Sequence, residues 1–169
     1  MKSDIKTGLP PLIAPDCRVL ILGSFPGLAS LAAQQYYGHP RNHFWFIILN
    51  ILELCPDVPC KVSYQNRCDL LLRHGVGLWD VYAACERQGS LDADIRRAQV
   101  NDFSKVLVQC PQLQAIAHNG GESYKHRRHT EALGLPVYKL PSTSPANASW
   151  SLARKLNAWR EALQPHLGT

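Results

Sequence analysis

The sequence has no apolar run long enough to cross a membrane and no apolar segment close to its start. A membrane-spanning helix needs about 20 apolar residues, and the first nine residues carry Lys2, Asp4 and Lys6 where a signal peptide would be apolar. These absences predict a cytoplasmic protein that is not associated with a membrane. Repeats and low-complexity tracts are also missing. We therefore expect a single domain over residues 1–169, with its core at about 17–165.

Charged residues are scarce, at 18% of the chain, whereas hydrophobic residues make up 46%. This composition is typical of a globular protein and argues against a disordered one. The net charge of +5 is compatible with a polyanionic partner such as nucleic acid, although charge alone does not establish one. A single domain of this size predicts a monomer.

The sequence also lacks the spacings that bind metals, clusters or nucleotides. Its six cysteines form no CxxC pair, and Cys55, Cys60 and Cys68 are followed by no second cluster. We therefore expect reduced, buried structural thiols and no metal site, since His126 and His129 have no evident third ligand. Neither GxxxxGK[ST] nor GxGxxG occurs, so no nucleotide cofactor is expected. The absence of GxSxG places a Ser/His hydrolase last among the possible functions.

What is present is an alternation of strand-like and helix-like segments. Short apolar runs that end at turn residues predict strands, and amphipathic or apolar stretches that end near proline or glycine predict helices. The predicted strands are 18–22, 77–83, 114–118 and 136–140, and the predicted helices are 42–54, 63–74, 101–110, 121–133 and 149–163. Such alternation implies right-handed crossovers and parallel strand pairing. The sequence therefore predicts an α/β fold, a three-layer α/β/α sandwich with a central, mostly parallel four-stranded sheet.

Ligands of such sheets bind at the carboxyl ends of the strands, so the loops at 23–42, 80–90, 119–124 and 141–149 should converge. The first of these opens with Gly-Ser-Phe-Pro-Gly at 23–27. Its glycines allow backbone N–H groups to approach a ligand closely, although a plain strand-to-helix turn explains them equally well. Asp80 follows Trp79 in the second predicted strand, where a polar site residue can lie, but we favour a helix cap.

Residues 36–45 bring aromatic side chains, His39, Arg41 and Asn42 together just before a buried helix. Aromatic faces can stack on a base, arginine can hold phosphate, and asparagine can bond a base edge or a water. Asn42 is also a good N-cap for the helix, and the residues alone favour that role. Residues 140–149 place small hydroxyl side chains before another helix, where an anion can bind, although Ser149 can equally be only its cap.

In this order and spacing the three segments resemble the uracil-DNA glycosylase superfamily. RVLILGSFPG and YGHPRNHFW are similar to GINPG and HPxNRFW of the mismatch-specific uracil glycosylases, and LPSTSPAN resembles the second signature motif of the superfamily. The resemblance covers about residues 17–165. It implies a three-layer α/β fold, DNA as the partner, and excision of a deaminated base that is flipped out of the duplex.

One departure from the motifs bears on the substrate. The mismatch-specific branch positions its attacking water with the asparagine of GINPG, and Phe25 occupies that position here. The sequence therefore resembles more closely the hypoxanthine-DNA (deoxyinosine) glycosylases, in which the asparagine of the GHPRNxFW segment takes over. By that resemblance Asn42 is the catalytic residue. Ser142 stands where other branches have His or Asn in the second motif.

The resemblance also implies the residues that bind the base. Tyr37 is expected to stack on it. The backbone near Gly23, Ser24 and Phe25 would bond its polar edge, with Phe25 as an apolar wall. Asn119 matches an asparagine near the base edge in some branches, although a left-handed turn residue before glycine is an equal interpretation.

For the DNA backbone, the resemblance implies phosphate contacts by Ser142 and Ser144 and a wedge formed by Pro145, Ala146 and Asn147. The three motifs contain no lysine, which argues against a lyase step through a Schiff base.

Two alternatives remain beside a deoxyinosine glycosylase. One is a mismatch-specific uracil glycosylase, and the other is an inactive DNA-binding relative in which Asn42 only caps its helix. His39 and His43 flank Asn42, but a structural role is the more common one for such residues. For the basic run at 125–129, we favour a solvated helix face over a DNA-binding patch.

Overall fold

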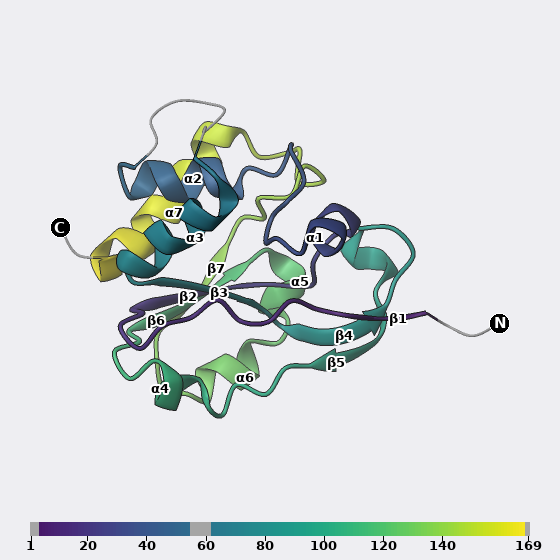
Figure 1. Ribbon diagram of the computed structural model, residues 1–169, viewed down its shortest axis with the longest axis horizontal. Coiled ribbons are helices and arrows are strands. Elements are labelled where there is room, and N and C mark those ends of the chain that lie inside the picture. Colours follow the sequence, from purple (N-terminus) through teal and green to yellow (C-terminus); the bar gives the residue numbers. More distant parts are fainter. Residues whose placement is uncertain (1–3, 55–61, 168–169) are drawn as a thin grey trace.

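A four-stranded parallel sheet lies between two layers of helices in the computed structural model, which describes residues 4–54 and 62–167 (Figure 1). The strand order is β3-β2-β6-β7, and all three pairings are parallel. These strands are β2 (Val19–Gly23), β3 (Val76–Asp80), β6 (Ala115–Asn119) and β7 (Val137–Leu140). The predicted α/β/α sandwich with a parallel four-stranded sheet is confirmed.

Longer helices cover one face of the sheet and short ones cover the other (Figure 1). The first layer contains α2 (Phe44–Ile51), α3 (Tyr64–Arg73) and α7 (Leu152–Leu167). The second contains α4 (Val106–Gln109), α5 (Gly121–Tyr124) and α6 (Arg127–Glu131). Helix α1 (Leu28–Ala33) follows β2 directly.

Strand β2 is buried along its whole length because both of its faces are covered. Val19 and Ile21 point into the core beneath α2, α3 and α7. Leu20 and Leu22 point into a second core on the opposite face, which Phe103 shares. The alternation of side chains along a strand thus explains why this segment reads as a continuous apolar run rather than an alternating one.

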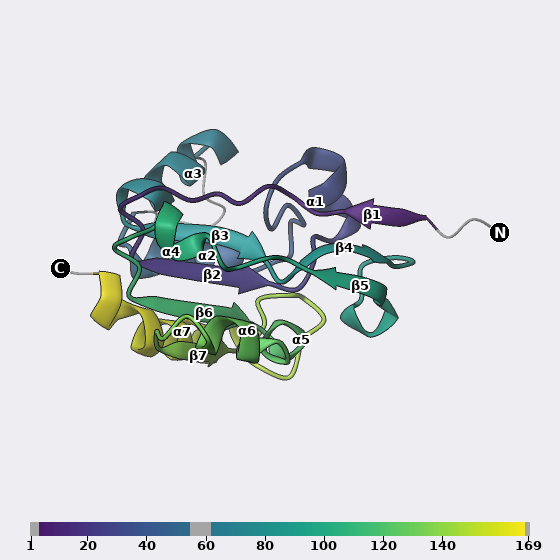
Figure 2. The same cartoon turned by 90° about the horizontal axis from the view of Figure 1, so that it is seen from below.

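A second, antiparallel sheet was not predicted. It contains β1 (Ile5–Thr7), β4 (Tyr82–Glu86) and β5 (Arg96–Val100) in the order β1-β4-β5, with a short 3₁₀ helix, Asp92–Asp94, before β5. Figure 2 shows this sheet extending past the carboxyl ends of the parallel strands.

The single strand predicted at 77–83 is therefore wrong. The chain leaves the parallel sheet after Asp80, and the backbone N–H groups of Val81 and Tyr82 bond the carbonyls of Gly23 at 2.8 Å and Ser24 at 3.0 Å. The apolar pattern continues across this junction without glycine or proline, so no local signal marks the change of sheet.

Several helices differ from their predicted bounds. The predicted helix at 101–110 contains only the four residues of α4, and the one at 121–133 is divided into α5 and α6. Helix α7 begins at Leu152, and the Ser151 hydroxyl accepts a hydrogen bond from the backbone N–H of Arg154 at 3.2 Å. Ser151, and not Ser149, is therefore the residue that caps this helix.

Four of the cysteines are buried thiols, as expected: Cys17, Cys68, Cys85 and Cys110. Cys55 and Cys60 lie outside the described residues. Among residues 4–54 and 62–167, no helix combines the length and apolar character required to span a bilayer.

Trp159 joins helix α7 to the rest of the first core. Its ring is fully buried and packs edge-on against Phe44, with ring centroids 5.9 Å apart. Its Nε1 donates to the carbonyl oxygen of Pro141 at 2.9 Å, which fixes the start of the loop between β7 and α7. One side chain therefore supports both the core and that loop.

We expect Trp159→Phe to lower the free energy of unfolding by about 2–3 kcal/mol, because it leaves a cavity and an unpaired carbonyl. Urea denaturation of the purified variant measures this loss. The control is Trp150→Phe, which alters a half-buried ring stacked against the Arg154 guanidinium and should change stability much less. Equal stability of Trp159→Phe and the wild type would contradict the assigned role.

Candidate functional site

Three loops meet at the carboxyl ends of the parallel strands, and one amide side chain joins them. Asn119 is the last residue of β6 and is 8% exposed. Its Nδ2 donates to the Tyr37 hydroxyl at 3.2 Å and to Thr143 Oγ1 at 3.0 Å. Its Oδ1 accepts a hydrogen bond from the backbone N–H of Thr143 at 3.1 Å. The predicted convergence of the loops after β2, β6 and β7 is therefore present.

The turn after Asn119 corrects one interpretation. Gly120 adopts the left-handed conformation with φ +94°, whereas Asn119 belongs to the strand. A Cβ at position 120 would lie 3.1 Å from Cβ of Ser142, so glycine also permits the close approach of the two loops. The alternative of Asn119 as a left-handed turn residue is wrong. Its contact with a base edge stays a prediction.

Tyr37 is held against the first helix of the site. Its ring stacks on Phe44, with centroids 4.0 Å apart and an interplanar angle of 25°, and its backbone has a positive φ of 54°. Burial and the nearby Asp80 carboxyl raise the pKa of Tyr37, so its phenol stays protonated. Phe44 covers one face of the ring, and Tyr37 as a whole residue is half-buried. Stacking of the ring on a base stays a prediction.

The segment after β2 brings its backbone close to the site, whereas its side chains are engaged elsewhere. Gly23 has almost no space beside it, since a Cβ there would lie 2.5 Å from Asp80 Oδ1. The Ser24 hydroxyl donates to Asp92 Oδ1 at 2.6 Å. Phe25 is 6% exposed and packs in the second core, where the Arg87 guanidinium lies 5.3 Å from its ring. Its ring thus offers little surface as an apolar wall, and contacts of this segment with a base remain predictions.

Asn42 lies directly before His43, the N-cap of α2, so the predicted N-cap is displaced by one residue. Its Oδ1 accepts a hydrogen bond from the backbone N–H of Phe44 at 2.9 Å. This hydrogen bond occupies one of the two lone pairs of that oxygen, and Nδ2 donates to no described residue. Asn42 is therefore oriented by its helix but not fully engaged. A catalytic role is compatible with this geometry and stays a prediction.

Two serine hydroxyls stabilise turns within the loop between β7 and α7. Ser142 Oγ accepts a hydrogen bond from the backbone N–H of Ser144, and Ser144 Oγ accepts one from that of Ala146, both at 3.2 Å. Asn147 Nδ2 donates to the carbonyl of Ser142 at 3.1 Å. The serine hydroxyls act as acceptors in these turns, so each still has its proton to donate. Pro145 is half-buried and Ala146 is exposed at the tip, and their contacts with DNA remain predictions.

Asp80 lies beside the site, although the sequence analysis favoured a helix-capping role for it. It ends β3 and caps no helix, so the predicted capping role is wrong. The side chain is 5% exposed, and its Oδ2 has no hydrogen-bond partner among the described residues. Burial raises the pKa of this carboxyl to about 7, against an opposing contribution from Arg87. The available signal was its charge, because Asp80 is the one acidic residue of the otherwise apolar segment at 77–83.

Lys155 is a second residue that the sequence did not reveal. It lies on α7 and is 1% exposed, and its Nζ lies 3.5 Å from both His43 Nδ1 and the carbonyl oxygen of Ser144. No ion pair in the described residues involves it. Burial lowers the pKa of Lys155, and burial together with the lysine lowers that of His43. The backbone N–H of His43 also donates to the carbonyl of Thr143 at 3.0 Å, so Lys155 lies behind the junction of two site loops.

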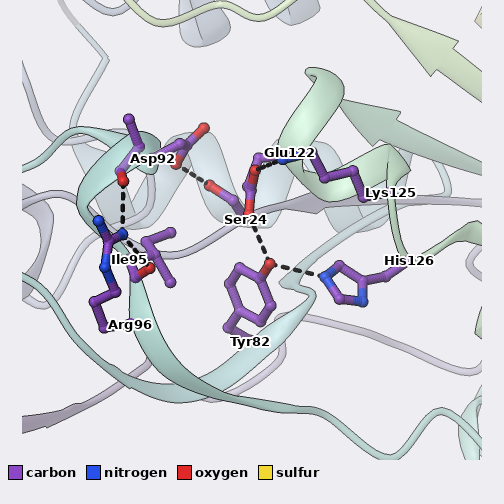
Figure 3. A network of polar contacts seen from close by, with 9 residues as sticks. Ser24, Tyr82, Asp92, Ile95, Arg96, Glu122, Lys125 and His126 are labelled. Carbon is purple, nitrogen blue, oxygen red and sulfur yellow. Dashed lines mark hydrogen bonds and ion pairs between the residues drawn. The ribbon is translucent and has the colours of Figure 1, made fainter.

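A separate polar network connects β4 to α5 below the Ser24 turn (Figure 3). The Tyr82 hydroxyl donates to Glu122 Oε1 at 2.8 Å and lies 2.8 Å from His126 Nε2. Lys125 pairs with Glu122 at 2.7 Å, and Arg127 pairs with Glu131 at 3.7 Å. Lys125 and Arg127 thus have acidic partners, whereas Arg128 is in no ion pair of the described residues. The two pairs support the interpretation of this run as a solvated helix face.

Comparison with known proteins now places this geometry in a family. A family model described as "UDG: Uracil DNA glycosylase superfamily" matches residues 10–164. The chain belongs to the uracil DNA glycosylase superfamily. The resemblance inferred from the three motifs is therefore confirmed.

Two archaeal members of the superfamily are similar along nearly their whole length. The "Hypoxanthine DNA glycosylase" of Methanosarcina barkeri (strain Fusaro / DSM 804) is 38% identical over 159 residues, which cover 94% of this chain and 98% of that protein. The protein of the same name from Methanosarcina acetivorans is 35% identical over 152 residues, with coverage of 89% and 94%. A "G/U mismatch-specific uracil DNA glycosylase" of Schizosaccharomyces pombe is 29% identical over 102 residues, which cover 60% of this chain and 30% of that protein.

A solved structure agrees with the fold. The solution NMR structure of a candidate uracil DNA glycosylase from Methanosarcina acetivorans superimposes with a TM-score of 0.84. The two chains are 34% identical, and the match covers 97% of this chain and 99% of the other. The three-layer architecture is thus shared by another member of the uracil DNA glycosylase superfamily.

We expect Lys155→Met to unfold at the same or a higher urea concentration than the wild type. A lone buried ammonium costs several kcal/mol, and methionine fills a similar volume without charge. The folded state lowers the pKa of Lys155 below its unfolded value, so the wild type recovers stability as the pH rises. The difference in free energy of unfolding between the wild type and Lys155→Met should therefore become smaller toward alkaline pH. Lys105→Met, at an exposed site, is the control; a large loss of stability in Lys155→Met would show that folding needs the charge.

Proposed function

We propose that this protein is a DNA glycosylase that hydrolyses the N-glycosidic bond of a deaminated base, hypoxanthine in deoxyinosine, after the nucleotide has flipped out of the duplex. Two relatives that match nearly the whole chain carry the name hypoxanthine DNA glycosylase. Flipping costs a few kcal/mol and is easiest for a poorly paired base. A mispaired deoxyinosine meets that condition.

The observation that carries the proposal is the geometry of the 36–45 segment. Tyr37 presents a ring with one face against Phe44, and Asn42 is oriented by its hydrogen bond to the start of α2. A flipped purine stacked on Tyr37 would bring its sugar toward Asn42. The second lone pair of Asn42 Oδ1 then accepts a hydrogen bond from a water that attacks C1′.

The reaction that these residues support is dissociative. Asparagine cannot act as a general base at neutral pH, so Asn42 only positions the water. The bond from C1′ to the base breaks first, and the electron pair leaves with the base. Water then adds to the cationic sugar and loses a proton, while the base anion gains one. Fixed backbone dipoles near Gly23 and Ser24 stabilise the departing anion, and the phosphates of the DNA stabilise the sugar cation.

The remaining loop binds the DNA itself. Ser142 and Ser144 have hydroxyl protons to donate to the phosphates next to the lesion, and Pro145, Ala146 and Asn147 form the wedge. DNA is the partner of this surface, and a monomer is sufficient for it. Hydrolysis requires water alone, without a metal or a nucleotide cofactor and without a strand-cleaving step.

The buried state of Phe25 favours hypoxanthine over uracil. In the mismatch-specific motif this position carries the asparagine that positions water, whereas here the ring is 6% exposed and packs in the core. The relative with a uracil-specific name matches only 60% of this chain. The test is a panel of duplexes that contain deoxyinosine, deoxyuridine or deoxyxanthosine, scored for base release. Release of uracil but not hypoxanthine would overturn the assignment.

We expect Asn42→Ala to reduce single-turnover release of hypoxanthine by about 100-fold or more, because the water is no longer positioned. Loss of the hydrogen bond to the backbone N–H of Phe44 should cost only about 1 kcal/mol of stability. Asn42→Ser is the matched variant, because its hydroxyl can still accept that hydrogen bond although it has no amide. It should be as slow as Asn42→Ala while regaining stability. Near-normal release by either variant would remove Asn42 from the mechanism.

We expect Ser144→Ala to weaken binding to a duplex that contains an abasic-site analogue by about 10-fold, because a hydrogen bond to a charged phosphate is lost. Fluorescence anisotropy at fixed salt measures the dissociation constant. Ser104→Ala is the control, since Ser104 is exposed and lies just before α4, outside the loops of the site. Equal affinity of Ser144→Ala and the wild type would exclude a phosphate contact by this hydroxyl.

A further inference from the structure

A buried cation without a counter-charge among the described residues lies near the start of helix α7. Lys155 is the fourth residue of α7 and is 1% exposed, and none of the ion pairs in the described part of the chain includes it. Its Nζ lies 3.5 Å from the carbonyl oxygen of Ser144 and 3.5 Å from Nδ1 of His43. These distances are longer than those of ordinary hydrogen bonds. An ammonium is rarely buried with such weak partners, because its desolvation is costly.

The position of Lys155 on the helix adds to this cost. The N-terminal end of a helix carries a partial positive charge, which favours acidic side chains there and disfavours a cation. The first turn of α7 contains no acidic residue. The helix end and the ammonium therefore produce positive potential in the same place. Two separate features thus favour an anion next to the start of α7.

The loop at 142–147 lies directly against this positive charge. The carbonyl oxygen of Ser144 is turned toward Lys155 Nζ. The hydroxyl of the same residue accepts a hydrogen bond from the backbone N–H of Ala146 and keeps its own proton to donate. An anion bound by that hydroxyl would therefore be separated from the ammonium by a single residue. Charges that interact through protein are screened much less than charges that interact through water.

We propose that the buried ammonium of Lys155 is the counter-charge of one DNA phosphate that binds on the other side of Ser144. Lys155 does not touch the DNA and acts through the loop. This inference rests on the proposed function, in which Ser142 and Ser144 donate to the phosphates next to the lesion. A phosphodiester carries one negative charge at neutral pH and reaches the loop only when DNA is bound. The charge that destabilises the free protein therefore stabilises the complex.

Burial gives this charge a role that an exposed lysine does not have. A surface side chain samples many positions, and dissolved ions screen its charge over about 8 Å at physiological salt. The ammonium of Lys155 is fixed in the core and is protected from those ions. Phosphate contacts determine the register of a protein on its duplex. We therefore expect Lys155 to fix which phosphate meets Ser144, whereas exposed cations attract any part of the DNA.

The first test is affinity for a duplex that contains an abasic-site analogue, measured by fluorescence anisotropy over a range of salt concentrations. Lys155→Met should bind about 10-fold more weakly than the wild type. Its plot of log Kd against log salt concentration should be shallower by about 0.9, the contribution of one phosphate. Lys105→Met removes the same charge from an exposed position before α4 and should change both quantities much less. A salt dependence of Lys155→Met equal to that of the wild type would contradict the inference.

A second variant separates the charge from the hydrogen bond. Lys155→Gln keeps an N–H donor near the carbonyl of Ser144 but carries no charge. It should bind the duplex as weakly as Lys155→Met and show the same shallow salt dependence. Wild-type affinity of Lys155→Gln would mean that Lys155 only holds the loop in place, and the proposed charge pair would be wrong.

A modified duplex identifies the phosphate. Each of the two phosphates next to the abasic-site analogue is replaced in turn by an uncharged methylphosphonate. At one of these positions the replacement should weaken binding of the wild type about 10-fold more than that of Lys155→Met, because the variant has already lost the charge pair. A merely structural role of Lys155 predicts equal losses for the two proteins at both positions, and that result would exclude the inference.

Urea denaturation and base release complete the test. Lys155→Met and Lys155→Gln should both be folded; if neither folds, the charge serves the structure and the inference is wrong. The catalytic part of the proposed function is judged separately by release of hypoxanthine from deoxyinosine duplexes. A wild type that shows the expected affinities but releases no base would overturn that part alone. A wild type without affinity for the duplex would overturn both.

Discussion

The hydrogen bonds of one buried amide hold the site together. Asn119 stands at the end of a central parallel strand, where its backbone is fixed by the sheet, and its side chain bonds both Tyr37 and Thr143. The Tyr37 segment and the loop after β7 are also joined by the bond from the backbone N–H of His43 to the carbonyl of Thr143. Because the amide uses both its donors and an acceptor on these loops, it orients them before any ligand arrives. Such preorganisation is what electrostatic catalysis requires.

Around this amide the protein keeps two ionisable side chains that form no ion pair among the described residues. Asp80 lies on the side of Gly23, and Lys155 lies behind the junction of His43 and Ser144. Each is nearly inaccessible to solvent, and each shifts its pKa toward the neutral form. An apolar side chain of similar volume would stabilise the fold at either position. Buried ionisable groups with shifted pKa values are common at functional sites, where they lower the stability of the fold.

The fold could be predicted from the sequence where burial follows a regular pattern. The segment at 18–22 reads as a buried strand because both faces of β2 are covered, and the alternation of such segments with helices implied the parallel sheet. The prediction failed where the sequence stays apolar although the chain leaves one sheet and enters the other. Residues 77–83 cross from the parallel sheet to the antiparallel one without any local break. Strand β5 is mostly exposed, so no buried face marks it as a strand.

The sequence by itself determined the order of three motifs, the superfamily they resemble, the strands that precede them and the place of Asn42 just before a helix. These features depend on residue type and on short spacings, which the chain carries locally. Only the tertiary structure decided that Asn119 bonds a tyrosine 82 positions away, that Asp80 lacks a partner and that Lys155 lies behind the loop at Ser144. The physical reason is that hydrogen-bond partners and desolvation depend on which distant segments the fold brings together. A local sequence pattern indicates whether a residue is buried. It does not identify the distant groups that surround its side chain.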